Sequence, residues 1–179
     1  MALQIKMAET PEEFEQIERL IYETFVEEIP QHPQNQAKRL KDKFHEKNQY
    51  LIAILEGEVV GMVVLNDKRP FSLDYKIKNL DDLLPPFNKI VEVRLLAIQK
   101  SVRGGKILFE LIRAMVEWNQ DKGVDIAIIS GTTRQQKLYK KMGFVPFHPA
   151  IGSEDATFIP MVLVANQFLA AHKHIITQH

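Results

Sequence analysis

One stretch of the sequence, residues 90–130, constrains the fold more than any other. It opens with a β-rich run over 90–98, passes through Gly104 and Gly105 into an amphipathic helix, and closes with a nearly all-apolar run over 124–130. The helix carries apolar residues at a spacing of three to four, which gives it one apolar face. An all-apolar run is typical of a strand buried on both faces of a sheet. The stretch therefore predicts two parallel strands joined by a right-handed helical crossover.

The elements around this stretch predict a mixed α/β domain. Residues 10–13 (TPEE) form a capping box with proline at the first helical position, so a helix begins there. The charged segment 36–47 predicts a second, solvated helix. Two β-rich runs, 49–55 and 59–66, flank a short Gly-containing turn and predict a hairpin. Further along the chain we expect a helix over 134–142, strands over 144–149 and 157–164, and a terminal helix over 166–176.

Residues 67–90 interrupt this regular pattern. They contain three prolines and mixed apolar residues, and an insertion of this length in a compact domain is usually functional or mobile. We expect a loop there with one short helix near residues 80–84. Phe71 and Tyr75 are its candidates for a substrate lid.

Composition narrows the class of protein. The chain of 179 residues predicts a single domain over 1–179, with a C-terminal helix and tail over 166–179. Lys and Arg together number 23, as do Asp and Glu, and this balance argues against nucleic acid as a partner. The absence of cysteine excludes disulfides, cysteine-based zinc sites and thiol nucleophiles. No apolar run approaches the ~18 residues of a membrane span, and the histidines form no metal-ligand set. We expect a soluble, cytoplasmic protein without a membrane partner or a metal.

The loop between residues 98 and 107 has the features of an anion site. It joins a strand to a helix, so the first helical N–H groups and the helix dipole face one concavity. Two adjacent glycines let an anion approach the backbone, while Lys100, Arg103 and Lys106 add positive charge. The nucleotide P-loop and the dinucleotide fingerprint are both absent. The loop thus predicts a cradle for a diphosphate.

A second motif follows the apolar strand: Leu138-Tyr139-Lys140-Lys141-Met142-Gly143-Phe144. Together and in this order, the two motifs resemble the GNAT superfamily of CoA-dependent N-acyltransferases over roughly residues 50–148. The resemblance implies the GNAT fold, a mixed and mostly antiparallel twisted sheet flanked by helices, in which strands 4 and 5 are parallel and splayed. It also implies acetyl-CoA as cofactor, and dimers are common in this superfamily.

The resemblance further assigns the cofactor contacts. The backbone of the fourth strand would hold the pantetheine and polarise the thioester carbonyl, and the loop amides would hold the pyrophosphate. Gly104 matches the superfamily pattern, whereas Ser101 and Lys106 depart from it. The cofactor-binding candidates are Leu96, Ala97, Ile98, Arg103, Gly104, Gly105, Lys106 and Ile107.

Three side chains are candidates for the chemistry. Tyr139 stands at the position where many superfamily members protonate the departing sulfur, and a phenol with a pKa near ~10 suits that task; the alternative is a tyrosine that only packs. Glu92 and Arg94 lie on one face of their strand, where two charges need a partner. They form either an ion pair or a substrate pocket, with Glu92 as general base and Arg94 holding a substrate carboxylate.

The predicted function is transfer of acetyl from acetyl-CoA to the primary amine of a small-molecule or peptide acceptor, by direct attack. One alternative is a longer-chain N-acyltransferase, similar to N-acyl amino acid synthases and homoserine-lactone synthases, although their Glu-x-x-Arg spacing is not met here. A second alternative is a degenerate GNAT domain that binds CoA without turnover. A third is a non-catalytic interaction module, which calorimetry with CoA would separate from the others.

Overall fold

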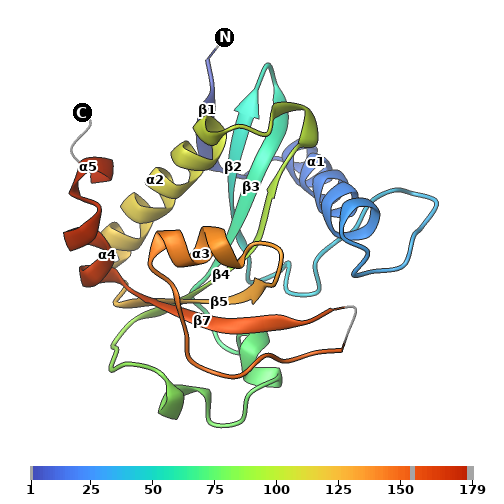
Figure 1. Ribbon diagram of the computed structural model, residues 1–179. Helices are drawn as coiled ribbons and strands as arrows, with labels where there is room; N and C mark the ends of the chain where they lie inside the picture. The colour runs from blue at the N-terminus through green and yellow to red at the C-terminus, as the bar shows by residue number, and fades with distance from the viewer. Residues whose placement is uncertain (1, 154–155, 177–179) are drawn as a thin grey trace. The chain divides into compact units, whose positions relative to one another are not determined.

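The computed structural model, drawn in Figure 1, describes residues 2–153 and 156–176. The chain divides into two compact units. The first unit runs up to Leu65 and includes Leu95–Val116. The second unit contains Asn66–Arg94 and the chain from Glu117 onward. The expectation of a single domain stays a prediction.

The strands of the first unit are antiparallel neighbours. β1 (Gln4–Met7) pairs with β2 (Gln49–Leu55), and β2 pairs with β3 (Glu58–Asn66). The β2–β3 turn places Glu56 and Gly57 at φ values of 55° and 83°, as a two-residue hairpin turn requires. The predicted hairpin is confirmed, whereas β1 was not predicted because four residues are too short to show a periodicity.

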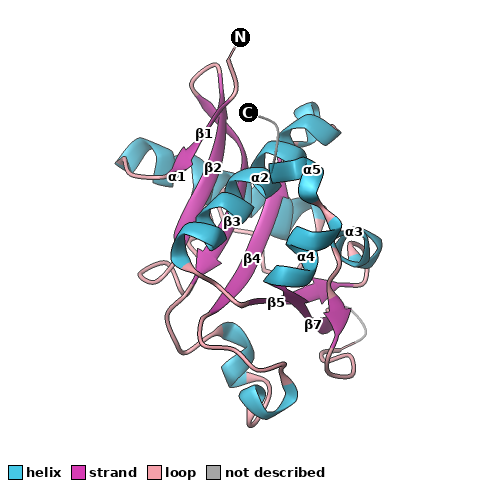
Figure 2. Cartoon of the chain, turned by 90° about the vertical axis from the view of Figure 1, so that its left-hand side faces the viewer, coloured by secondary structure: helices cyan, strands magenta, loops and turns pink. Residues whose placement is uncertain are grey.

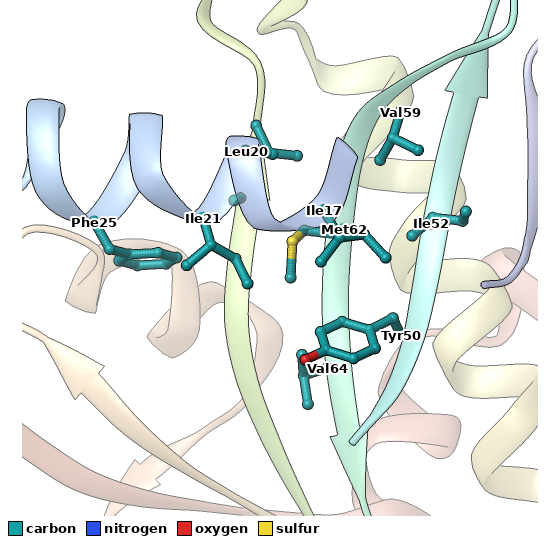
Figure 3. Packing of buried hydrophobic residues seen from close by; sticks show 10 residues of the cluster. Ile17, Leu20, Ile21, Phe25, Tyr50, Ile52, Val59, Met62 and Val64 are labelled. Atoms are coloured by element: carbon teal, nitrogen blue, oxygen red, sulfur yellow. The ribbon is translucent and has the colours of Figure 1, made fainter. Parts of the chain in front are cut away.

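Helix α1 (Pro11–Tyr22) begins at the predicted capping box. The Glu13 amide donates to the Thr10 hydroxyl, and the Thr10 amide donates to the Glu13 carboxylate. The helix continues as a π-helix over Glu23–Glu28. Its apolar face packs on β2 and β3 in a buried cluster, drawn in Figure 3, of Ile17, Leu20, Ile21, Phe25, Tyr50, Ile52, Val59, Met62, Val64 and Ala97.

Helix α2 (Gly105–Lys122) packs closely on β3 through the part of it that belongs to the first unit. A Cβ placed on Gly61 would lie 3.1 Å from the Ile107 side chain and 3.3 Å from that of Leu111. Met62 packs against α1, and neighbouring strand residues face opposite sides of a sheet. β3 therefore lies between α1 and α2.

The predicted helix over 36–47 is wrong. This segment forms turns, and Lys38 adopts a φ of 50° in the left-handed region. Its charged sequence has no apolar stripe that could bury a helical face. Single contacts hold it instead: Arg39 pairs with Glu18 at 2.8 Å, and Phe44 is buried.

The second unit contains the start of β4 (Ile90–Ile98), followed by β5 (Ile126–Thr132), β7 (Phe158–Val164) and β6 (Val145–Pro146). β4 and β5 are parallel, as predicted, and the remaining neighbours are antiparallel. Within this unit β4 pairs with β5 only from Ile90↔Ile126 to Glu92↔Ile128, at the beginning of both strands. The mixed sheet of the predicted fold is confirmed.

Helices complete the second unit. α3 (Gln136–Met142) ends at Gly143, whose φ of 99° suits glycine, and α4 (Ala165–Ala171) and α5 (Lys173–Ile176) replace the single predicted terminal helix. Among the described residues, no helix has the length and apolar character needed to cross a membrane.

The insertion is an ordered layer of the second unit. It contains 3₁₀ helices at Ser72–Tyr75 and Leu80–Leu83, visible in Figure 2 as short cyan turns within a pink loop. Its apolar side chains form one buried cluster with β5 and β7: Phe71, Leu73, Ile77, Leu80, Ile126, Ile128 and Val162. Phe71 is thus a core residue rather than part of a lid, whereas Tyr75 is exposed.

Candidate functional site

Glu92 lies on β4 with a side chain that is fully buried. Its Oε1 accepts a hydrogen bond from the Ser72 amide at 3.0 Å, and its Oε2 accepts from the Ser72 hydroxyl at 2.8 Å and the Leu73 amide at 3.2 Å. All three donors belong to the insertion. The carboxylate therefore fastens the insertion to β4, and its role as general base stays a prediction.

Arg94 follows two residues later on the same strand. Its Nε lies 3.7 Å from Oε1 of Glu92, and its side chain is 14% exposed. The predicted ion pair is thus present. A guanidinium suits a carboxylate ligand, because its planar set of N–H donors matches the two carboxylate oxygens. Binding of a substrate carboxylate by Arg94 stays a prediction.

Tyr139 lies in the middle of α3, and its ring packs against the end of β5. Its hydroxyl donates to Oε1 of Gln135 at 2.8 Å. Its ring packs edge-on against the ring of Phe144, with 6.1 Å between the ring centroids. A Cβ on Gly131 would lie 3.3 Å from the tyrosine ring, so this glycine leaves room for the ring. Burial raises the pKa of Tyr139 to about 12. The phenol is protonated at neutral pH and can donate a proton, although its role as catalytic acid stays a prediction.

The cofactor candidates lie in the first unit, on the end of β4 and the loop that leads into α2. Leu95, at the unit boundary, has a φ of 51° and interrupts the regular strand just before Leu96. The loop after Ile98 contains a 3₁₀ turn over Lys100–Val102. The Arg103 side chain donates to the Ile98 carbonyl at 3.0 Å and pairs with Glu28 at 2.7 Å. Arg103 therefore links the loop to the end of β4 and to Glu28.

Gly104 and Gly105 are exposed at the start of α2. A Cβ on either residue would have no described atom within 4 Å, and neither residue has the left-handed φ that favours glycine. Neither packing nor backbone conformation therefore requires glycine at these two positions. Open space over main-chain N–H groups at a helix start fits a pyrophosphate. Lys106 is exposed beside it, whereas the Ile107 side chain is buried.

The site residues thus fall into two groups. Glu92, Arg94 and Tyr139 belong to the second unit, and the eight cofactor candidates belong to the first. Sequence reasoning missed Ser72, whose contact with Glu92 spans 20 residues and leaves no local pattern. It also missed Gln135 as the partner of Tyr139, which the spacing of four on a helix would have suggested.

Comparison with known proteins gives a family match. The family model of the N-acyl amino acid synthase FeeM matches residues 16–166. A search of curated proteins finds no significant sequence match.

Solved structures resemble the whole chain. A CoA-dependent acyl-homoserine lactone synthase, BjaI, solved with SAM and isopentyl-CoA, is 23% identical with a TM-score of 0.76, over 93% of this chain and 84% of that one. FeeM from uncultured soil microbes is 13% identical with a TM-score of 0.73, over 94% of both chains. An N-acetyltransferase from Staphylococcus aureus Mu50 is 16% identical with a TM-score of 0.61, over 92% of this chain and 99% of that one. At these identities the likeness shows the fold, and the predicted GNAT fold is confirmed.

Proposed function

Because the chain belongs to the family of the N-acyl amino acid synthase FeeM, we propose that it transfers a longer acyl chain from an acyl thioester to the amino group of an α-amino acid. The family match over residues 16–166 is the observation that carries this proposal. It favours the longer-chain alternative over acetyl transfer to an unspecified amine. Acetyl-CoA as the donor rests on the GNAT resemblance alone.

The donor would be held by the first unit. The open main chain at Gly104 and Gly105 suits a pyrophosphate, and the backbone of Leu96, Ala97 and Ile98 would bind the pantetheine. A bound acyl-CoA would supply an acyl group activated as a thioester. Arg103 would act indirectly, because its contacts with Ile98 and Glu28 keep the loop in shape.

The chemistry needs no covalent enzyme intermediate. The acceptor nitrogen attacks the thioester carbonyl, the C–N bond forms, the C–S bond breaks, and the amine gives up a proton to solvent water. Tyr139, protonated at neutral pH, is the proposed donor of a proton to the departing thiolate. Arg94 is the proposed ligand of the acceptor carboxylate, and the buried Glu92 holds its guanidinium.

The test is a matrix of donors and acceptors with the full chain. The donors are acetyl-, butanoyl-, octanoyl- and dodecanoyl-CoA and an acyl carrier protein loaded with the longest chain. The acceptors are the common amino acids, S-adenosylmethionine, and tyramine as the decarboxylated counterpart of tyrosine. Thiol release and product mass report turnover.

We expect kcat/KM with octanoyl-CoA to exceed that with acetyl-CoA by about 100-fold or more, because each buried methylene adds roughly fourfold. We also expect an amino acid to be preferred over its decarboxylated counterpart. Equal or better turnover with acetyl-CoA would restore the acetyltransferase prediction. CoA binding without turnover of any pair would favour the degenerate domain.

A further inference from the structure

Two buried hydroxyl groups lie at the end of β5. Within residues 2–153 and 156–176, Oγ of Ser130 and Oγ1 of Thr132 have no hydrogen-bond partner. A buried hydroxyl without a partner is unfavourable, and apolar residues are the usual choice on a buried strand face. The two positions therefore need an explanation that the fold itself does not supply.

Both hydroxyl residues belong to the row of β5 that faces the insertion. Residues two apart on a strand share one face, so Ser130 and Thr132 continue the row of Ile126 and Ile128. Ile126 and Ile128 pack with apolar side chains of the insertion. The row is therefore apolar where the insertion covers it and turns polar at its end.

On the same face, the neighbouring strand β4 also carries polar side chains where its pairing with β5 ends. Glu92 is paired in register with Ile128, and it contacts Ser72 of the insertion, which places its side chain on the insertion face. Arg94 and Ser130 each lie two residues beyond this last pair, so both follow on that face. A guanidinium on β4 and two hydroxyl groups on β5 thus follow on the same face, beyond the last paired residues of the two strands.

The charges of this group indicate an anionic ligand. The Glu92 carboxylate already accepts three hydrogen bonds from the insertion, in addition to its contact with Arg94. Ser130 and Thr132 add hydroxyl donors and no negative charge. A guanidinium with neighbouring hydroxyl donors is a typical receptor for a carboxylate.

We propose that the Ser130 and Thr132 hydroxyls, with Arg94, bind the carboxylate of the amino acid acceptor and so select acceptors that carry one. This assignment deepens the proposed function and rests on it. It makes Ser130 and Thr132 specificity-determining residues on β5, in addition to the charged pair on β4.

The test compares Ser130→Ala, Thr132→Val and the double variant with the parent chain. We expect KM for the amino acid to rise about tenfold in each single variant, with KM for the acyl donor unchanged, because one hydrogen bond to a charged group is lost. Turnover of the decarboxylated amine should be unaffected, so the preference for the amino acid shrinks. Thr133→Val, at an exposed neighbouring position, is the matched control and should leave both KM values unchanged.

Two results would overturn the assignment. One is a rise in KM for the acyl donor alone, which would place the hydroxyls against the acyl chain. The other is an unchanged preference for amino acid over amine. Thermal melting checks the fold: removal of an unpartnered hydroxyl should leave the ligand-free Tm equal or higher.

A binding experiment separates this assignment from the proposed function. If the parent chain forms no acyl amino acid, the proposed function fails, and calorimetry with the amino acid and with the amine still tests the site. Binding of the amino acid alone, lost in the double variant, would support the carboxylate site. No binding of the amino acid by the parent chain would overturn the site as well.

Discussion

The Ser72 hydroxyl donates to the buried carboxylate of Glu92 across 2.8 Å, and this contact joins the insertion to β4. Two backbone amides, of Ser72 and Leu73, complete the set of donors. A charge without water is stable only with such partners. The same carboxylate lies 3.7 Å from Nε of Arg94, so one residue contacts both the insertion and the guanidinium.

Glu92→Gln tests whether this residue is an anchor. The amide NH₂ of glutamine would face the amides or hydroxyl that now donate to the carboxylate, so we expect a loss of about 2 kcal/mol of stability and a Tm lower by roughly 5 °C. Ser72→Ala should give part of the same loss, and Ser101→Ala, in an exposed turn, none. If Glu92 is instead a general base, Glu92→Gln lowers kcat steeply at unchanged Tm. Thermal melting and kcat together distinguish the two roles.

Tyr139→Phe removes the proposed proton donor and keeps the ring. We expect kcat to fall about 100-fold with KM for the acyl donor unchanged, because general acid catalysis contributes on that scale. Tyr22→Phe removes another buried hydroxyl, which contacts the Asn35 backbone, and should spare kcat. Equal kcat in parent and Tyr139→Phe would exclude Tyr139 from the mechanism.

The raised pKa of Tyr139 predicts that the folded protein loses stability at alkaline pH. Burial raises its pKa to about 12 in the folded chain, from 10 in the unfolded chain. The folded state therefore binds the proton more tightly, and this contribution to stability is complete below pH 10 and disappears as the pH rises towards 12. Denaturant unfolding of the parent chain and Tyr139→Phe at several pH values measures the difference. A difference that stays constant from pH 9 to pH 12 would contradict the burial of the phenol.

Gly104→Val tests the cradle. A Cβ at Gly104 would have no described atom within 4 Å, so the variant should fold normally, with an unchanged Tm. The added side chain would occupy the space over the loop amides, and we expect CoA affinity to fall beyond detection by calorimetry. Gly104→Ala, with a smaller side chain, should lose less. Full affinity in a folded Gly104→Val would refute the cradle.

Glu13 should govern the acid stability of α1. Its carboxylate accepts hydrogen bonds from the Glu9 and Thr10 amides and one from Lys6, which lower its pKa to about 2. The stabilisation is present above the ordinary pKa of 4.5 and is lost as the pH falls towards 2. The Tm difference between the parent and Glu13→Gln should therefore shrink over that range. Glu12→Gln, at an exposed position in the same turn, should show no such change.

Local patterns predicted much of the fold. The capping box, the β2–β3 hairpin and the β4–α2–β5 unit were all visible because each depends on the spacing of neighbouring residues. The helix expected over 36–47 is wrong, because this charged segment has no apolar stripe. Contacts with distant residues, such as that of Arg39 with Glu18, hold the segment in turns instead. The identity of the acyl donor stays a prediction, because no motif in the two CoA segments reports on the length of the acyl chain.

The sequence by itself determined the central strand–helix–strand order, the hairpin and the two motifs that point to acyl transfer, because hydrophobic spacing and glycine positions act over a few residues. Only the tertiary structure decided what the buried polar groups do. Glu92 meets Ser72 from 20 residues away, and Ser130 and Thr132 join the face of Arg94 only once β4 and β5 pair. The Glu92–Ser72 contact depends on how the insertion packs, and the shared face depends on strand register; no local pattern encodes either.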